Sequence, residues 1–207
     1  WNEPDLRVGG VTNGPERAAA FAIRTAEIVR REIPDATIAA FALSWANAGF
    51  VRPLLAELKA RGKTGLFDTI AYHHYKANPD DGYDEVEACR RVVAEYAPNL
   101  RLREGEGGTL SAWRAVGALS RPPWTARTQA TPHPPRAPGD LGHGDDTSVF
   151  HICDLEYRTS GFHDGLVRYG LLKTTGQAEG FRVLKVKKAY YAVQNAVSVF
   201  NDALEAE

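Results

Sequence analysis

Apolar and polar residues follow two different rhythms along the chain, and these rhythms predict helices and buried strands in turn. Residues 16–33 place apolar side chains three and four positions apart, which is typical of a helix with one apolar face. Pro15 before this segment and Pro34 after it mark a sharp start and a sharp end. Residues 36–43 are instead continuously apolar and short, which indicates a strand buried on both faces.

The same alternation continues along the chain and defines the expected fold class. Helices are predicted at residues 49–61, 84–96 and 187–203, and strands at residues 67–72, 100–103 and 148–153. Buried strands that alternate with helices indicate an α/β fold with a parallel sheet. Right-handed crossovers leave two architectures, an open doubly wound sheet or part of a (β/α)8 barrel. The chain has 207 residues, fewer than the roughly 250 that a whole barrel typically needs.

A proline-rich stretch interrupts this alternation where a further helix would fall. Residues 122–138 hold six of the twelve prolines. Proline lacks a backbone N–H and clashes with the preceding turn of a helix, so residues 131–138 are predicted not to be helical. We expect residues 122–146 to form an irregular loop within a single domain that covers residues 1–207.

Composition and charge exclude several classes of function. Lys and Arg number 25 against 26 Asp and Glu, a net charge of −1 that excludes binding to nucleic acid through bulk positive charge. No apolar run of about 18 residues occurs, so no membrane span is expected. The two cysteines, Cys89 and Cys153, cannot build a disulfide framework and leave the localisation open. No glycine-rich phosphate-binding motif occurs either, so we expect no cofactor.

In βα units, functional residues lie in the loops that follow the strands. The residues at these positions are Glu3 and Asp5 at the start of the chain, Ser44, Trp45 and Asn47, then His73, His74 and Tyr75, then Glu104 and Glu106, and last Asp154, Glu156 and Tyr157. Two carboxylates that face each other beside aromatic rings suit cleavage of a glycosidic bond. One carboxyl group protonates the leaving oxygen, and the other attacks the anomeric carbon or activates water.

A metal site is the alternative use of the same loops. His73, His74, His151 and Asp154 are the residue types that bind zinc. No HExxH or CxxC spacing accompanies them. We therefore expect no metal.

Four segments together resemble one enzyme family. They are WNEP at residues 1–4, IAYHHY at 70–75, LREGEGG at 102–108 and KKAYYAVQN at 187–195. In this order they resemble the fourth-strand Asn-Glu-Pro, the sixth-strand His-x-Tyr, the seventh-strand nucleophile segment and the last helix of clan A glycoside hydrolases, among them xylosidase-like and cellulase-like members. These enzymes are retaining (β/α)8 barrels. The distance in sequence from Glu3 to Glu106 leaves room for three βα units.

The resemblance implies a role for five residues. Glu3 would be the general acid/base, and Glu106 the nucleophile that forms a glycosyl-enzyme intermediate. Asn2 would bind the 2-hydroxyl group of the sugar, Tyr75 would donate a hydrogen bond to the nucleophile, and His73 would line the same pocket. The substrate would be an oligosaccharide or polysaccharide with β-glycosidic bonds.

Some assignments stay open within this resemblance. Trp45, Trp124 and Tyr157 are unranked candidates for stacking on a sugar face. Glu104 competes with Glu106 as nucleophile, and the flanking glycines favour Glu106.

The resemblance covers only the end of the fourth strand through the eighth strand, about the C-terminal half of a barrel. Because half a barrel leaves open sheet edges, the alternative expectation is an inactive half-barrel that binds carbohydrate. A further alternative is that the chain self-associates, or pairs with an N-terminal half that completes the barrel. The sequence leaves open the sugar, the linkage and the choice between endo and exo action.

Overall fold

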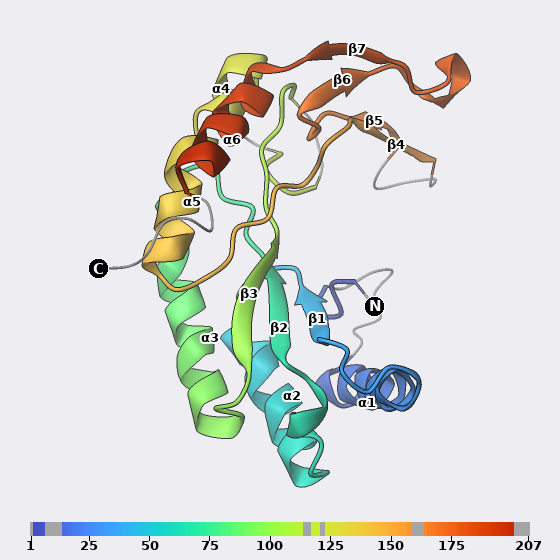
Figure 1. Ribbon diagram of the computed structural model, residues 1–207, viewed down its shortest axis with the longest axis vertical. Coiled ribbons are helices and arrows are strands. Elements are labelled where there is room, and N and C mark those ends of the chain that lie inside the picture. The colour runs from blue at the N-terminus through green and yellow to red at the C-terminus, as the bar shows by residue number, and fades with distance from the viewer. Residues whose placement is uncertain (1, 7–13, 114–116, 121–122, 159–163, 201–207) are drawn as a thin grey trace. The chain divides into compact units, whose positions relative to one another are not determined.

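The computed structural model describes residues 2–6, 14–113, 117–120, 123–158 and 164–200 (Figure 1). The chain forms two compact units, residues 1–74 with 82–105 and residues 75–81 with 106–207. Within the described ranges, no helix is long and apolar enough to cross a membrane.

The first unit is built on a three-stranded parallel sheet in the order β1–β2–β3 (Figure 1). Its elements are α1 (Pro15–Glu32), β1 (Ala39–Leu43), α2 (Ala48–Ala60), a 3-10 turn (Thr64–Leu66), β2 (Thr69–His73), α3 (Tyr83–Tyr96) and β3 (Arg101–Glu106). Helices and strands alternate as the sequence predicted, so the α/β class is confirmed. A partial (β/α)8 barrel is a more specific prediction than the α/β class. The described strands of this sheet form no closed barrel.

Local sequence explains where these helices begin and end. Pro15 is the first residue of α1, where a missing N–H removes no helical hydrogen bond. Two arginines occupy the last turn of α1, where positive charge interacts favourably with the helix dipole. Asn47 caps α2, because its side chain accepts a hydrogen bond from Phe50 N at 3.1 Å.

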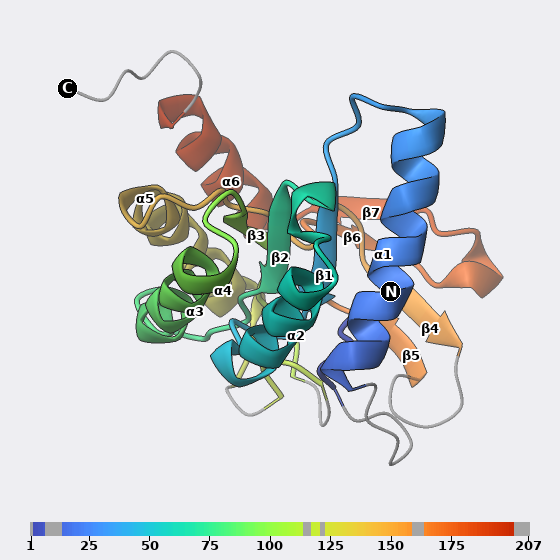
Figure 2. The same ribbon diagram turned by 90° about the horizontal axis from the view of Figure 1, so that it is seen from below.

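The core of the first unit lies between the sheet and its helices. Figure 2 shows α2 and α3 side by side along the sheet. The largest of its side chains with less than 2% exposure are Leu43, Val51, Leu54, Leu55, Leu58, Ile70, Tyr72 and Val86. Burial of a Leu or Ile side chain contributes roughly 1.5–3 kcal/mol. This packing holds the strands at whose ends the candidate residues lie.

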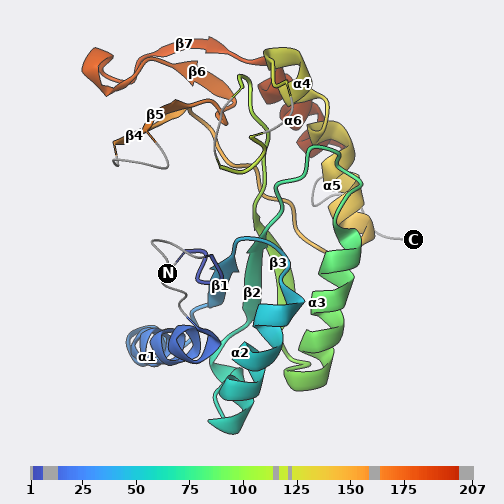
Figure 3. The ribbon, with the colours of Figure 1, turned by 180° about the vertical axis from the view of Figure 1, so that it is seen from behind.

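In the part of the second unit that the structure describes, three helices accompany two antiparallel strand pairs. Its elements are α4 (Ala126–Ala130), α5 (His133–Gly142), β4 (Leu155–Arg158) paired with β5 (Asp164–Val167), β6 (Leu172–Thr174) paired with β7 (Val183–Val186), a 3-10 turn (Gln177–Glu179) and α6 (Lys188–Val199). Helix α6 packs against both α4 and α5 (Figure 3). A small core of Leu110, Trp124, Val167 and Tyr169 lies beside these elements.

The strand predicted at residues 148–153 is wrong. In this segment only Cys153 forms a β-bridge, an isolated parallel one with Leu172. Upstream, Phe150 N donates instead to Gly107 O at 2.6 Å, and Ile152 O accepts from Leu172 N at 2.7 Å. The backbone groups of residues 148–153 therefore form hydrogen bonds with two separate segments, one near Gly107 and one near Leu172. An apolar run predicts burial, but it does not supply the continuous neighbour that a strand needs.

The irregular loop predicted at residues 122–146 is also wrong, because α4 and α5 lie within it. Pro134 and Pro135 occupy the first turn of α5, where backbone N–H groups have no partner inside a helix. Only Pro138 lies deeper in the helix. The steric rule against proline applies to the helix interior, and most of these prolines avoid it.

Candidate active site

The acidic segment at the start of the chain is tied to the end of β1. Glu3 N donates to Ala42 O at 2.9 Å, so the chain continues along the edge of that strand. Leu6 N donates back to Glu3 O at 3.1 Å and closes a turn. Glu3 has a φ of 48°, in the left-handed region that non-glycine residues rarely adopt. Such backbone conformations persist where surrounding contacts hold them, and they concentrate at functional sites.

Asp5 fastens the same segment to the loop between β1 and α2. Its carboxylate accepts hydrogen bonds from Ser44 N at 2.8 Å, Ser44 Oγ at 2.9 Å and Asn47 Nδ2 at 3.3 Å. Asn47 is also the residue that caps α2. Asp5 therefore links the turn that carries Glu3 to the start of a packed helix. No sequence motif indicates this role of Asp5, although Asp5 follows Glu3 by two positions and Ser44 and Asn47 follow a predicted strand.

Glu3 and His73 form the candidate pair of the first unit. His73 is the last residue of β2, and its Nδ1 lies 2.9 Å from Glu3 Oε1. The His73 side chain is 3% exposed and that of Glu3 is 27% exposed. The carboxyl group of Glu3 is thus held by a buried imidazole and remains partly open to solvent. This geometry suits a carboxyl group that exchanges a proton with a ligand.

Tyr75 and Glu106 form the candidate pair of the second unit. Glu106 is the last residue of β3, and Tyr75 follows β2 by two residues. Tyr75 Oη donates to Glu106 Oε1 at 2.5 Å. This separation lies at the short end of the range for a hydroxyl that donates to a carboxylate, about 2.5–2.7 Å. The bond stabilises the charged carboxylate and fixes the orientation of its second oxygen.

The remaining predicted residues fall into different surroundings. Asn2 and Trp45 are exposed in the first unit, and Trp45 is exposed by 43%. Tyr157 lies on β4 and is half-buried. Trp124 is only 6% exposed, and its Nε1 donates to Leu119 O at 2.6 Å. That burial leaves little of the Trp124 ring for a sugar to stack on.

Glu104, the competing nucleophile, lies in a different environment from Glu106. It is fully buried within β3, whereas Glu106 at the end of the strand is partly exposed. A nucleophile has to contact its substrate, so the burial of Glu104 favours Glu106.

Among the described residues, no three His, Cys, Asp or Glu side chains lie close enough to share an ion. Asp154 instead accepts from buried Lys187 Nζ at 2.6 Å and from Arg168 at 3.4 Å. Burial lowers the pKa of Lys187, and the neighbouring Asp154 carboxylate opposes this shift. Asp154 is therefore part of a buried ion-pair network in the second unit.

The fold and the residues at the strand ends define an α/β protein with carboxylates at the ends of parallel strands. No protein-family model matches the sequence, and no curated protein matches it. Solved structures do match. A GH2 β-galacturonidase from Eisenbergiella tayi bound to galacturonate matches with a TM-score of 0.61 and 13% identity over 98% of this chain. An FMN-binding β-glucuronidase from Facaelibacterium prausnitzii L2-6 matches with a TM-score of 0.57 and 16% identity over 94% of this chain.

These matches show a shared fold with part of two glycoside hydrolases. The chain spans 33% of the first protein and 28% of the second. The resemblance to glycoside hydrolases that the sequence motifs predicted therefore finds support at the level of the fold.

Proposed function

We propose that this chain belongs to a glycoside hydrolase that cleaves β-glycosidic bonds with retention of configuration. Glu106 is the nucleophile, Glu3 is the general acid/base, and Asn2 binds the 2-hydroxyl group of the sugar. The observation that carries the proposal is the hydrogen bond from Tyr75 to Glu106. It holds the Glu106 carboxylate in a fixed orientation, in the segment whose sequence resembles the nucleophile strand.

The proposed reaction has two steps. In the first, a Glu106 oxygen attacks the anomeric carbon while the bond to the leaving oxygen breaks, and the Glu3 carboxyl proton passes to that oxygen. In the second, the Glu3 carboxylate takes a proton from water, and the water oxygen displaces Glu106 from the anomeric carbon. The mechanism requires the two carboxyl groups to stand about 5–5.5 Å apart when the sugar is bound.

Each hydrogen-bonded pair supports one of these roles. The Tyr75 hydroxyl stabilises Glu106 as an anion, which favours departure of Glu106 in the second step. The buried His73 ring holds Glu3 Oε1 and leaves the rest of this partly exposed carboxyl group for proton transfer.

A second candidate function is carbohydrate binding that requires a complementary half for catalysis. The observation that favours it is the order of the sheet, in which β1 and β3 are the outer strands among the described residues. A sheet edge presents unpaired backbone groups, to which another strand can add.

Intact-mass spectrometry with 2-deoxy-2-fluoro aryl β-glycosides tests the proposal directly. These compounds glycosylate the nucleophile of a retaining enzyme and release the aryl alcohol, which leaves a slowly hydrolysed glycosyl ester. We include β-glucuronides and β-galacturonides in the panel because the matched structures are a β-glucuronidase and a β-galacturonidase. The expected result is the addition of one glycosyl mass that peptide mapping places on Glu106.

Three variants assign the roles. Glu106→Gln should abolish labelling. Glu3→Gln should lower kcat/KM by orders of magnitude for glycosides with poor leaving groups and spare kcat/KM for those with activated leaving groups, because only the former need a proton in the first step. Glu95→Gln, at an exposed helix position, should match the wild type. Absence of labelling with every sugar would contradict the catalytic proposal, and binding by calorimetry without turnover would support the second candidate.

A further inference from the structure

Tyr75 lies outside regular secondary structure, so its backbone alone does not fix the position of its side chain. Tyr75 lies two residues beyond the end of β2, in a segment without helix or strand. Its hydroxyl group nevertheless lies 2.5 Å from Glu106 Oε1. A hydrogen bond this short requires the ring to stay in one position, so neighbouring side chains have to fix it.

Two aromatic rings of the second unit pack against Tyr75. The Tyr169 ring lies 5.5 Å from it at an interplanar angle of 61°, and the Phe150 ring lies 6.4 Å away at 83°. Tyr169 and Phe150 also contact each other at 5.9 Å and 71°. These edge-to-face geometries are the ones that aromatic pairs prefer. The three rings therefore contact one another in pairs, and Tyr75, whose hydroxyl group holds Glu106, is one of the three.

Tyr169 is itself anchored at both ends. Its hydroxyl group donates to Ala118 O at 2.6 Å, and its carbonyl group accepts from Gln129 Nε2 at 3.0 Å. Its exposure is 8%. Rotation of the Tyr169 side chain about its Cα–Cβ bond would break the hydrogen bond to Ala118 O, so this bond and the burial of the ring keep it in place.

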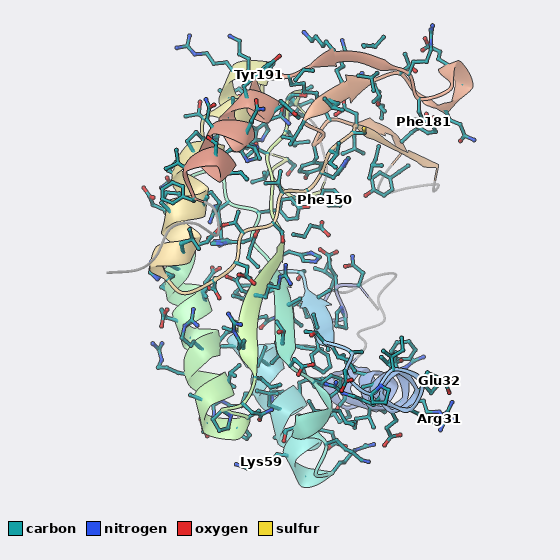
Figure 4. All side chains as sticks on the ribbon, viewed as in Figure 1. Arg31, Glu32, Lys59, Phe150, Phe181 and Tyr191 are labelled. Atoms are coloured by element: carbon teal, nitrogen blue, oxygen red, sulfur yellow. The ribbon has the colours of Figure 1, made fainter. Side chains whose placement is uncertain are left out.

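Phe150 is anchored to the segment that follows Glu106. Phe150 N donates to Gly107 O at 2.6 Å, and a Cβ atom added at Gly108 would lie 2.3 Å from Phe150 O. In Figure 4 the labelled Phe150 lies on the segment between α5 and β4. The support for the Tyr75 ring and the backbone next to Glu106 thus belong to one packed arrangement.

We propose that Tyr169 is a positioning residue, whose ring holds Tyr75 in the orientation that directs its hydroxyl group to Glu106. Tyr169 acts through Tyr75 and does not contact the substrate. The consequence for catalysis rests on the proposed function, whereas the effect on the Tyr75–Glu106 hydrogen bond does not.

The first test measures that hydrogen bond without any substrate. In protein labelled with 13C at tyrosine Cζ, the Tyr75 signal is assigned from the Tyr75→Phe spectrum. Glu106→Gln should shift this signal, because the hydroxyl group loses its carboxylate acceptor. In Tyr169→Leu the signal should already be displaced and should respond to Glu106→Gln by less than half as much. Tyr169→Phe loses the hydrogen bond to Ala118 O but keeps the ring that contacts Tyr75, so it should retain more than half of the wild-type response.

A control separates positioning from general loosening of the core. Val167→Ala removes buried volume from the same small core and should lower the thermal midpoint while the Tyr75 signal keeps its full response. If Tyr169→Leu does not fold, Phe150→Leu replaces it, with the same expected loss of response. A full response in a folded Tyr169→Leu variant would overturn the proposal.

The second test measures the rate at which the fluoroglycoside labels Glu106. Tyr169→Leu should slow labelling up to about a hundredfold, the cost of misplacing a reacting group by about 1 Å. The concentration that gives half-maximal rate should change little, and adding Tyr75→Phe should cause no further loss. A wild-type protein that no sugar labels would refute the proposed function, and the Tyr75 signal would still decide the role of Tyr169.

Discussion

His73 and Glu3 share a hydrogen bond of 2.9 Å between Nδ1 of the ring and Oε1 of the carboxyl group, and the ring is almost completely buried. A buried ring on a strand moves little, so it fixes the direction of the carboxyl group. Replacement of His73 by Leu should therefore slow glycosides with poor leaving groups by about 10- to 100-fold, and slow activated glycosides much less. The ratio of the two kcat/KM values measures the effect on proton transfer.

His143→Gln is the matched control for this variant, because His143 is an exposed histidine at the end of α5. It should leave both rates unchanged. An equal loss with both kinds of leaving group in His73→Leu would contradict an orienting role toward Glu3 and indicate general disruption instead.

Asp5 should contribute both to stability and to the placement of Glu3. Its carboxylate accepts three hydrogen bonds from Ser44 and Asn47. Hydrogen bonds to a charged group contribute about 1.5–3 kcal/mol each when buried, and these are partly exposed. We expect Asp5→Ala to lower the free energy of unfolding by about 1–3 kcal/mol in urea titrations. Asp35→Ala, at an exposed position after α1, should change it by less than about 0.5 kcal/mol. Equal effects of the two variants would contradict the anchoring role of Asp5.

The sequence predicted the first unit well because each of its elements carries its own signal. The helix-like spacing in residues 16–33 and the apolar run in residues 36–43 each reflect burial of one element, and α1 and β1 lie there. The second unit depends on pairing between distant segments. Residues 148–153 are mostly apolar, but their backbone hydrogen bonds go to residues near Gly107 and Leu172, which no local pattern reveals.

The candidate site shows the same division. The strand-end rule and the motifs predict Glu3, His73, Tyr75 and Glu106 as site residues from the sequence alone. The contacts that hold them were not predictable, because Asp5 and Tyr169 act through three-dimensional packing that spans about 40 and 90 positions of sequence respectively. The proline-rich segment was misjudged for another reason, since the rule on proline depends on its place within the helix.

Asp154 and Lys187 should dominate the stability of the second unit. Both side chains are buried, and Lys187 Nζ donates to Asp154 Oδ1 at 2.6 Å and to Ser111 Oγ at 2.9 Å. Removal of one member of a buried ion pair leaves the other charge buried without a partner, which typically lowers the free energy of unfolding by about 3–5 kcal/mol. We expect Asp154→Leu to lower the free energy of unfolding by this amount. The double variant Asp154→Leu with Lys187→Met should recover more than half of the loss, and additive losses in urea titrations would contradict this account.

His133 should make the free energy of unfolding depend on pH between about pH 6.5 and pH 4. Burial, and to a lesser degree the nearby Arg136 charge, lowers the pKa of His133 to about 4. Thr109 Oγ1 donates its hydrogen to Gln129 O at 2.7 Å, so at 3.2 Å the His133 Nε2–H donates to Thr109 Oγ1. The folded state therefore holds a neutral imidazole ring in a fixed hydrogen bond.

The sign of the pH effect follows from proton binding. The unfolded chain binds a proton at His133 below about pH 6.5, whereas the folded protein does so only near pH 4. The free energy of unfolding should fall as the pH falls through this window, by about 1.4 kcal/mol per pH unit for this residue. Between pH 7 and pH 5, we expect the wild type to lose about 2 kcal/mol more than His133→Gln in urea titrations. Burial also lowers the pKa of His151, but that contribution is common to both proteins and cancels in the difference. Identical pH dependence in the two proteins would show that His133 is protonated in the folded state.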